Sequence, residues 1–185
     1  MPILGTIASS FLTSLSDYDS IASVLVGAGG QSAVEFTSIP NTYKHLQIRG
    51  IARETANATQ NGWRMQFNAD TGSIYGTGQS YYNGSAPTDE FMNTTGMLLG
   101  EWPGAQRTSG VFFNFVIDIN NYSDSSMYKT YFSYGFYQSF GQGGFSNSAG
   151  GIWRNTSALT SIKLFESGGQ NLAQHTRISL YGIKG

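Results

Sequence analysis

Short apolar runs with a period of two are the feature that most limits what this chain can fold into. The clearest run covers residues 111–119, in which one face would carry Val111, Phe113, Phe115, Ile117 and Ile119. Successive side chains of a β-strand point to opposite faces, so this alternation predicts a strand with one buried face. We expect it to be a central strand of a sheet.

Further runs of this kind are separated by clusters of glycine, asparagine, serine and proline. They cover residues 21–26, 34–39, 43–52, 63–67, 127–140, 159–165 and 177–183. Between residues 76 and 110 regular alternation is lost except around Met97 to Leu99, which predicts a long loop region and a first candidate for a contact surface. With about eight to ten strands, residues 17–185 predict a single all-β domain, an antiparallel β-sandwich of jelly-roll-like type.

The first 16 residues differ from the rest. They are apolar and rich in small residues, but they lack the Lys or Arg of a secretory signal and are interrupted by Gly5 and several serines. We therefore expect residues 1–16 to be an extended N-terminal arm of the mature protein. The arm would dock on a neighbouring subunit through Ile3, Leu4, Ile7 and Phe11.

Charge and cysteine content exclude several classes of function. Only 11% of the residues are charged, the net charge is −1, and the ten Lys and Arg residues are scattered, which argues against nucleic-acid binding. No stretch approaches the length of a membrane span, so we expect a soluble protein with no membrane partner. The absence of cysteine excludes disulfides and thiolate metal sites. A surface made polar by hydroxyl and amide groups indicates an extracellular or virion-like protein.

The histidine, serine and acidic residues of the chain do not form the sequence motifs that catalytic or metal sites need. His45 and His175 have no acidic neighbour at the spacings that metal ligation needs, and no GxSxG motif presents a nucleophile. The amide-rich segment from Asp118 to Asp124 could hold Ca²⁺, but it lacks the glycine and closing glutamate of an EF-hand loop, so a capped turn is favoured. We predict no catalytic, cofactor or metal site, and a protein that is not an enzyme.

The aromatic residues indicate a contact surface instead. Residues 127–140 are too aromatic on both faces for either to be freely solvated, so one face is expected to meet another chain. We expect Phe113, Phe115, Phe132 and Phe165 to lie in the core. For the aromatic residues in the predicted loop region, contact and loop packing are equally supported. The candidate contact surface comprises Ile3, Leu4, Ile7, Phe11, Tyr81, Tyr82, Phe91, Trp102, Tyr134 and Tyr137.

Several segments together resemble a known family. They are the opening MPILGTIASS, residues 36–50 (FTSIPNTYKHLQIRG), the turn at 67–75, the run at 116–119 leading to 128–130, and the closing ISLYGIKG. In these the chain is similar to small virion-associated structural proteins of tailed bacteriophages, notably marine and freshwater phages including cyanophages. The similarity runs from end to end and is weakest in the long loop regions. It implies a β-sandwich, repeated copies on the particle, and no catalytic residues to carry over.

Three functions follow from these observations. The favoured one is a capsid decoration (cement) protein at the virion surface, forming a homotrimer and contacting the major capsid protein, because an N-terminal arm can reach across a neighbour. The alternative is a tail-fibre or receptor-binding tip that contacts other tail proteins and host surface glycans. A lectin-like carbohydrate-binding module is the third.

Overall fold

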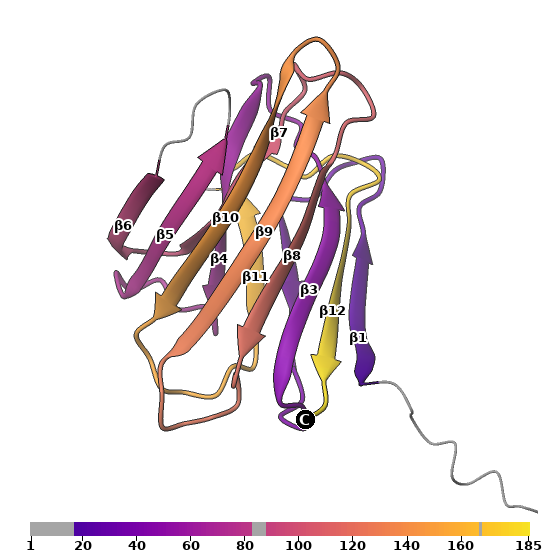
Figure 1. The fold of residues 1–185 in the computed structure, drawn as a ribbon. Coiled ribbons are helices and arrows are strands. Elements are labelled where there is room, and N and C mark those ends of the chain that lie inside the picture. The colour runs from indigo at the N-terminus through magenta and orange to yellow at the C-terminus, as the bar shows by residue number, and fades with distance from the viewer. Residues whose placement is uncertain (1–16, 83–87, 167) are drawn as a thin grey trace, which may run out of the picture.

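The computed structural model describes residues 17–82, 88–166 and 168–185, and the predicted arm with Ile3, Leu4, Ile7 and Phe11 lies outside them. Twelve strands form two antiparallel sheets that pack face to face, which confirms the predicted β-sandwich (Figure 1). In chain order they are β1 (Tyr18–Leu25), β2 (Ala33–Phe36), β3 (His45–Ala52), β4 (Gln60–Phe67), β5 (Tyr75–Tyr82), β6 (Thr88–Thr94), β7 (Met97–Pro103), β8 (Phe113–Asn120), β9 (Lys129–Ser139), β10 (Gly143–Trp153), β11 (Ile162–Glu166) and β12 (Arg177–Ile183). Within these residues there is no helix long and apolar enough to cross a membrane.

The two sheets are unequal in size. The larger has the order β1-β12-β3-β8-β9-β10-β5-β6 and the smaller the order β2-β11-β4-β7. Figure 1 shows the larger sheet in front, with β4, β11 and β7 behind it. The first and last strands pair with each other, so both ends of the described chain lie at one edge of the larger sheet.

The core lies between the sheets and follows the predicted alternation. In β8 the side chains of Phe113, Phe115, Ile117 and Ile119 are buried, and β8 pairs with β3 and β9 on either side, which confirms it as a central strand. These side chains face large residues of the smaller sheet. Trp102 stacks on Trp63 with ring centroids 4.5 Å apart and also on Phe115 at 4.9 Å.

The prediction of a loop over residues 76–110 is wrong up to Pro103, because that range contains β5, β6 and β7, whereas residues 104–110 do form a loop. Two register shifts hide β6 and β7 from a search for strict alternation, and β5 is hidden because Gly76, Gly78 and Ser80 give it no apolar alternation. One falls between Trp63 and Arg64, opposite Gly100, and the other between Tyr75 and Gly76. Gly100 has φ of 105°, a left-handed conformation that favours glycine at a bulge. The bulge shifts the phase of β7, so that Met97 and Trp102 both face the core.

Candidate functional site: the outer face of the larger sheet

Strand β9 presents a row of aromatic rings to solvent. Its residues alternate strictly between buried and exposed, and the outward row includes Phe132, Tyr134 and Phe136, which are 47%, 51% and 58% exposed. We call these three residues the aromatic ridge. At about 3.3 Å per residue, the ridge extends about 13 Å along the strand. Such a row on an inner strand of a sheet is a contiguous apolar surface of the kind that marks interaction sites.

A shallow strip of small residues lies directly beside the ridge. On β10 the outward neighbours of Phe132, Tyr134 and Phe136 are Gly150, Ser148 and Ser146. The next strand, β5, adds Gly78 and Ser80 opposite Gly150 and Ser148. We call these five residues the glycine–serine trough. Because neighbouring strands lie about 4.8 Å apart, ridge and trough run side by side along the same sheet.

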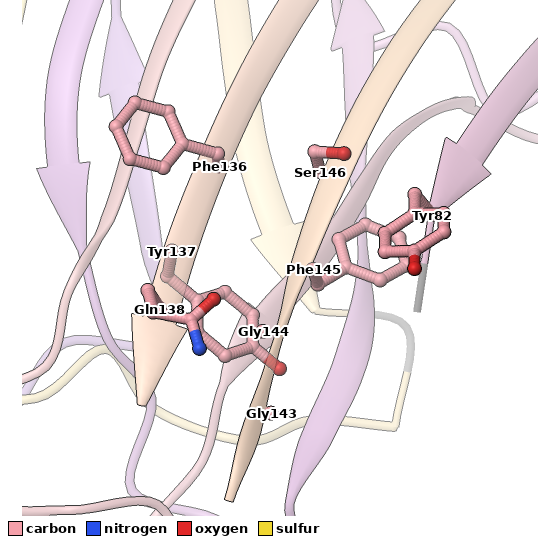
Figure 2. Close-up of a pocket in the computed structure, with 8 residues that line it drawn as sticks. All are labelled: Tyr82, Phe136, Tyr137, Gln138, Gly143, Gly144, Phe145 and Ser146. Atoms are coloured by element: carbon pink, nitrogen blue, oxygen red, sulfur yellow. The ribbon is translucent and has the colours of Figure 1, made fainter. Parts of the chain in front are cut away.

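Tyr82 closes one end of the trough. It pairs with Ser146 from the side opposite to Phe136, so that the two rings flank one serine, as Figure 2 shows. A groove of about 360 Å³ lies here, and its lining also includes Gln138 and Gly144. All of its lining residues belong to the described part of the chain, and none is charged. The groove can therefore accept a neutral group with flat apolar faces.

Charged groups on this face are few, and one of them, Asp118 of β8, is the cross-strand neighbour of Phe132 in the ridge. Arg49 of β3 lies over the rings of Tyr18 and Tyr181, 5.2 and 5.7 Å from their centroids. Its Nε donates to Gln47, whose amide donates to the Asp118 carboxylate at 2.6 Å. The remaining charged side chains on the described part of the face are those of Arg177 on β12 and Glu90 on β6. Positive charge is thus found toward β3 and β12, and negative charge at β8 and β6.

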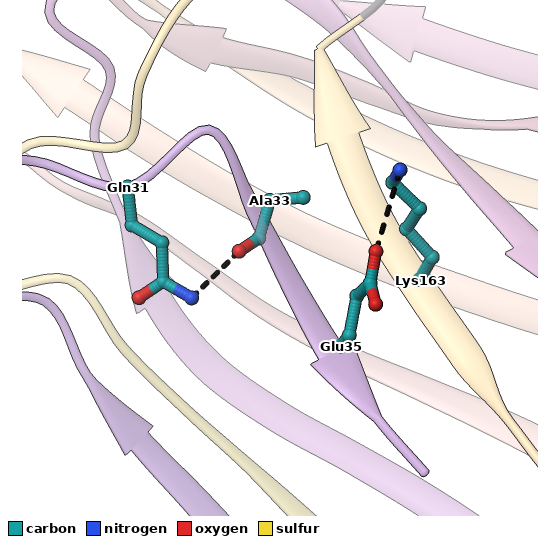
Figure 3. A network of polar contacts seen from close by, with 4 residues as sticks. All are labelled: Gln31, Ala33, Glu35 and Lys163. Carbon is teal, nitrogen blue, oxygen red and sulfur yellow. Dashed lines mark hydrogen bonds and ion pairs between the residues drawn. The ribbon is translucent and has the colours of Figure 1, made fainter.

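The outer face of the smaller sheet is different. Lys163 of β11 pairs with Glu35 of β2 at 3.3 Å, and nearby Gln31 donates to the Ala33 carbonyl at 2.7 Å (Figure 3). The half-exposed ring of Phe165 lies next to the Lys163 ammonium, 5.6 Å from ring centroid to Nζ. An ion pair and a cation-covered ring are typical of a solvated face. The candidate surface is therefore specific to the larger sheet.

The structure separates the described residues of the predicted contact surface into three groups. Tyr82 and Tyr134 lie exposed on the outer face. Tyr81 and Phe91 are half-buried on the inner side, where Tyr81 stacks on Phe145. A contact role was the wrong prediction for Trp102 and Tyr137. Both are buried, Trp102 against Trp63 and Tyr137 against Phe113 and Phe145.

Sequence reasoning also missed two ridge residues. Phe132 was expected in the core and Phe136 was not singled out, because the phase of β9 is misleading in the sequence. Three polar residues, Lys129, Ser133 and Ser139, lie on the inward face of β9 and are buried. In the sequence they make this face look like the solvent-exposed one. Lys129 tolerates burial because its ammonium donates to the carbonyls of residues 124, 127 and 156.

The remaining polar candidates have structural partners. Asp124 Oδ1 accepts from the backbone N–H and hydroxyl of Ser126, both at 2.6 Å, and forms the capped turn that the sequence favoured. His45 Nδ1 accepts from the Asn121 N–H at 3.2 Å, and His175 lies in the turn before β12 rather than on a strand. No group of three or more potential metal ligands gathers among the described residues.

Among the carboxyl groups of the described residues, Glu54 has the pKa that is raised most above its ordinary value. It follows β3, is 1% exposed, and accepts from Asn61 Nδ2 at 2.8 Å and Trp63 Nε1 at 3.3 Å. Burial raises its pKa to about 7, the two hydrogen bonds oppose the rise, and the negative charge of Glu166 adds to it. It contacts core and loop residues, so we assign it to the stability of the fold.

Comparison with models of known protein families found no match, and comparisons with curated proteins and with solved structures found none either. The function must therefore be argued from the outer face itself.

Proposed function

We propose that this protein is a structural subunit of a tailed-phage virion, a decoration protein on the particle surface that binds another protein through the outer face of its larger sheet. The observation that carries the proposal is the aromatic ridge, in which three rings are about half exposed on an inner strand. Enrichment in aromatic residues and depletion of charge distinguish the centre of protein interfaces from ordinary surface.

The ridge cannot be covered by rearrangement of the chain's own core. The other side of β9 is already filled, because Tyr131 and Tyr137 are buried there and Gly135 lies against the ring of Phe113. Turning β9 over would expose those residues in exchange. No described segment of the chain covers the ridge, and we infer that a second molecule does. Burying one such ring contributes about 1.5–3 kcal/mol.

Assignment to a phage particle rests on the sequence. Residues 36–50 and the closing ISLYGIKG resemble virion-associated structural proteins, and the low charge suits a subunit that packs in many copies. The partners we propose are other copies of the chain together with the major capsid protein or a tail protein. We propose no catalytic step.

Co-sedimentation with purified capsids and tails of the phage that encodes the chain tests this function. We expect the full chain to sediment with capsids and the variant Tyr134→Lys to lose most of that binding. The control is Phe165→Lys, which places the same charge on the outer face of the smaller sheet and should bind normally. Failure of the unaltered chain to bind either capsids or tails would overturn the proposal.

A glycan-binding role, as in a fibre tip or a lectin-like module, is the second candidate. The uncharged groove between Tyr82 and Phe136 favours it, because sugar rings stack on aromatic faces and hydrogen-bond to serine and amide groups. The test is binding of purified host-surface polysaccharide to the full chain and to Tyr82→Ala. Tyr128→Ala is the control, because Tyr128 is also exposed but precedes β9 and does not line the groove. Binding that Tyr82→Ala abolishes and Tyr128→Ala preserves would favour this role over decoration.

A further inference from the structure

The outer face is complementary to itself. We propose that it binds a second copy of the chain, the two larger sheets packing face to face around a two-fold axis that runs parallel to the strands between β9 and β10. This rests on the proposed function, since it names the partner of the same surface. An interface of this kind uses one patch twice, so every feature must meet its complement on the other copy.

The first argument is the match of large residues to small ones. Rotation about this axis places β9 of one copy over β10 of the other and keeps each residue at its own height along the strand. Tyr134 then lies over Ser148 of the second copy. Phe132 likewise lies over Gly150, and Phe136 over Ser146. Each ring of the ridge faces the trough in the sheet opposite.

The other two-fold axis in the plane of the sheet runs across the strands. It would place β9 over β9, so that rings face rings. The troughs of the two copies would then face each other, with no side chain to fill the space between them. Packed sheets interdigitate at a spacing of about 10 Å, which requires small residues opposite large ones. The arrangement of ridge and trough thus selects the axis along the strands.

The second argument concerns the next strand on each side. The same rotation places β5 of one copy over β8 of the other. Tyr82, Ser146, Phe136 and Asn114 form one row across the sheet, so Tyr82 lies over Asn114 of the second copy. Tyr82 is 59% exposed and carries a hydroxyl, for which an exposed amide is a suitable partner.

The third argument is charge. Strand β3 is the third strand from the axis on one side and β6 the third on the other, so β6 of one copy lies over β3 of the second. The outward charge on β6 is Glu90 and that on β3 is Arg49. Their rows differ by two residues, about 7 Å, which the long arginine side chain can span. Glu90 then lies over Gln47, with Arg49 two residues along β3 and Asp118 one strand away on β8. The attraction to Arg49 is therefore partly opposed by Asp118, and charge supports the arrangement less than the match of ridge to trough does.

Sheet twist concentrates the interface at its centre. Aligned sheets pack with their strands about 30° apart, so the match is closest near the axis and weakens toward the edges. The ridge and trough should therefore carry most of the binding, and the Arg49 and Glu90 contacts should mainly set orientation.

The test exchanges ridge and trough. Tyr134→Ser removes a central ring, and Ser148→Tyr sets a ring against a ring; each should weaken dimerisation about tenfold or more in sedimentation equilibrium of the full chain. The double variant Tyr134→Ser with Ser148→Tyr restores large-over-small packing and should recover most of the affinity. Far-UV circular dichroism and thermal unfolding check that each variant folds. A dimer that is insensitive to Ser148→Tyr, or a double variant weaker than both single variants, would overturn the arrangement.

Cross-linking gives an independent measurement, because the chain has no cysteine. Ser148→Cys introduces a thiol with little change in side-chain size. A short bismaleimide should then cross-link two copies through this residue. Lys163→Cys on the smaller sheet is the control and should not be joined. A monomer at all concentrations, or a trimer that ignores these variants, would reject the two-fold contact.

The outcomes separate this inference from the proposed function. If the chain is monomeric but Tyr134→Lys abolishes capsid binding, the shell protein covers the ridge; the inference then fails while the decoration role stands. If the chain dimerises as described but ignores capsids and tails, the inference stands and the decoration role fails. A monomer that binds polysaccharide through Tyr82 rejects both.

Discussion

Gly135 of β9 lies directly against the ring of Phe113, so closely that a Cβ at Gly135 would come within 2.6 Å of that ring and of the Asn114 carbonyl oxygen. Since one of these neighbours is backbone, the strand itself would have to shift. We expect Gly135→Ala to lower the free energy of unfolding by about 1–3 kcal/mol, measured by urea denaturation.

Gly78→Ala is the matched control for this substitution. Gly78 also lies within a strand of the larger sheet, but a Cβ there would meet nothing within 4 Å. The alanine should leave stability unchanged or raise it slightly by restricting the unfolded chain. Equal losses at both positions would show that the contact with Phe113 is not what requires glycine at position 135.

Glu54 should make the protein less stable as the pH rises. Its folded pKa is about 7, against an ordinary value of 4.5, so the folded state holds its proton more tightly than the unfolded state. Stability is lost as pH increases from about 4.5 through 7 and is then constant. Glu54→Gln removes this titration and should be more stable than the natural chain by about 3 kcal/mol at pH 8. Near pH 4 the two should be alike.

The comparison is the difference between variant and natural chain across pH, measured by thermal or urea unfolding. Glutamine fits the site because its oxygen accepts from Trp63 while its amide can donate to a rotated Asn61 side chain. The control is Glu35→Gln, which alters an exposed ion pair and should shift stability by about 0.5 kcal/mol or less at any pH. A pH-independent effect of Glu54→Gln would contradict the assigned acidity.

Lys129 should be far less replaceable than an exposed lysine. Its ammonium is fully buried and donates to the carbonyls of Met127 at 2.8 Å and Thr156 at 3.0 Å, and also to that of Asp124. Lys129→Met keeps the apolar stem but leaves these carbonyls without their donor, which should lower stability by about 3 kcal/mol. Lys163→Met, on the surface, should cost about 0.5 kcal/mol or less in the same urea titration. Similar losses would mean that water replaces the ammonium at position 129.

Strict alternation made parts of the fold predictable from sequence. Residues 177–183 were predicted as a strand with the bounds that β12 has, and β8 was predicted as a central strand with the correct buried face. These strands have no bulge, so the period of two holds from end to end. Strands β6 and β7 were missed because the register shifts beside Trp63 and Tyr75 interrupt that period, and β5 was missed because its glycines and serine give no apolar alternation.

The candidate site was predictable only in part. The excess of rings in residues 127–140 indicated aromatic residues on both faces of β9, and the structure places rings on the buried and on the exposed face. The expected contact of one face with another chain stays a prediction. The sequence could not indicate which face is exposed, because inward placement of Lys129 depends on carbonyls from two other turns, and those contacts exist only in the folded chain. The trough was equally hidden, since serine and glycine in β10 and β5 resemble turn residues until their pairing with β9 is known.

Arg53 should control the order of the loop between β7 and β8. Its guanidinium donates to four loop carbonyls, those of Ala105, Arg107, Thr108 and Val111, at 2.8–3.4 Å. One planar fork satisfies all four acceptors, while the backbone N–H groups of Gly104, Ala105 and Gln106 donate to carbonyls of residues 56–59. In Arg53→Ala the backbone amides of residues 104–111 should exchange with deuterium about tenfold faster or more. Exchange in β8 should change little, since its amides are held by β3 and β9. Arg177→Ala, which removes an exposed arginine from the outer face, should leave exchange in the loop unaltered. Unchanged loop exchange in Arg53→Ala would mean that the loop's own turns suffice to hold it.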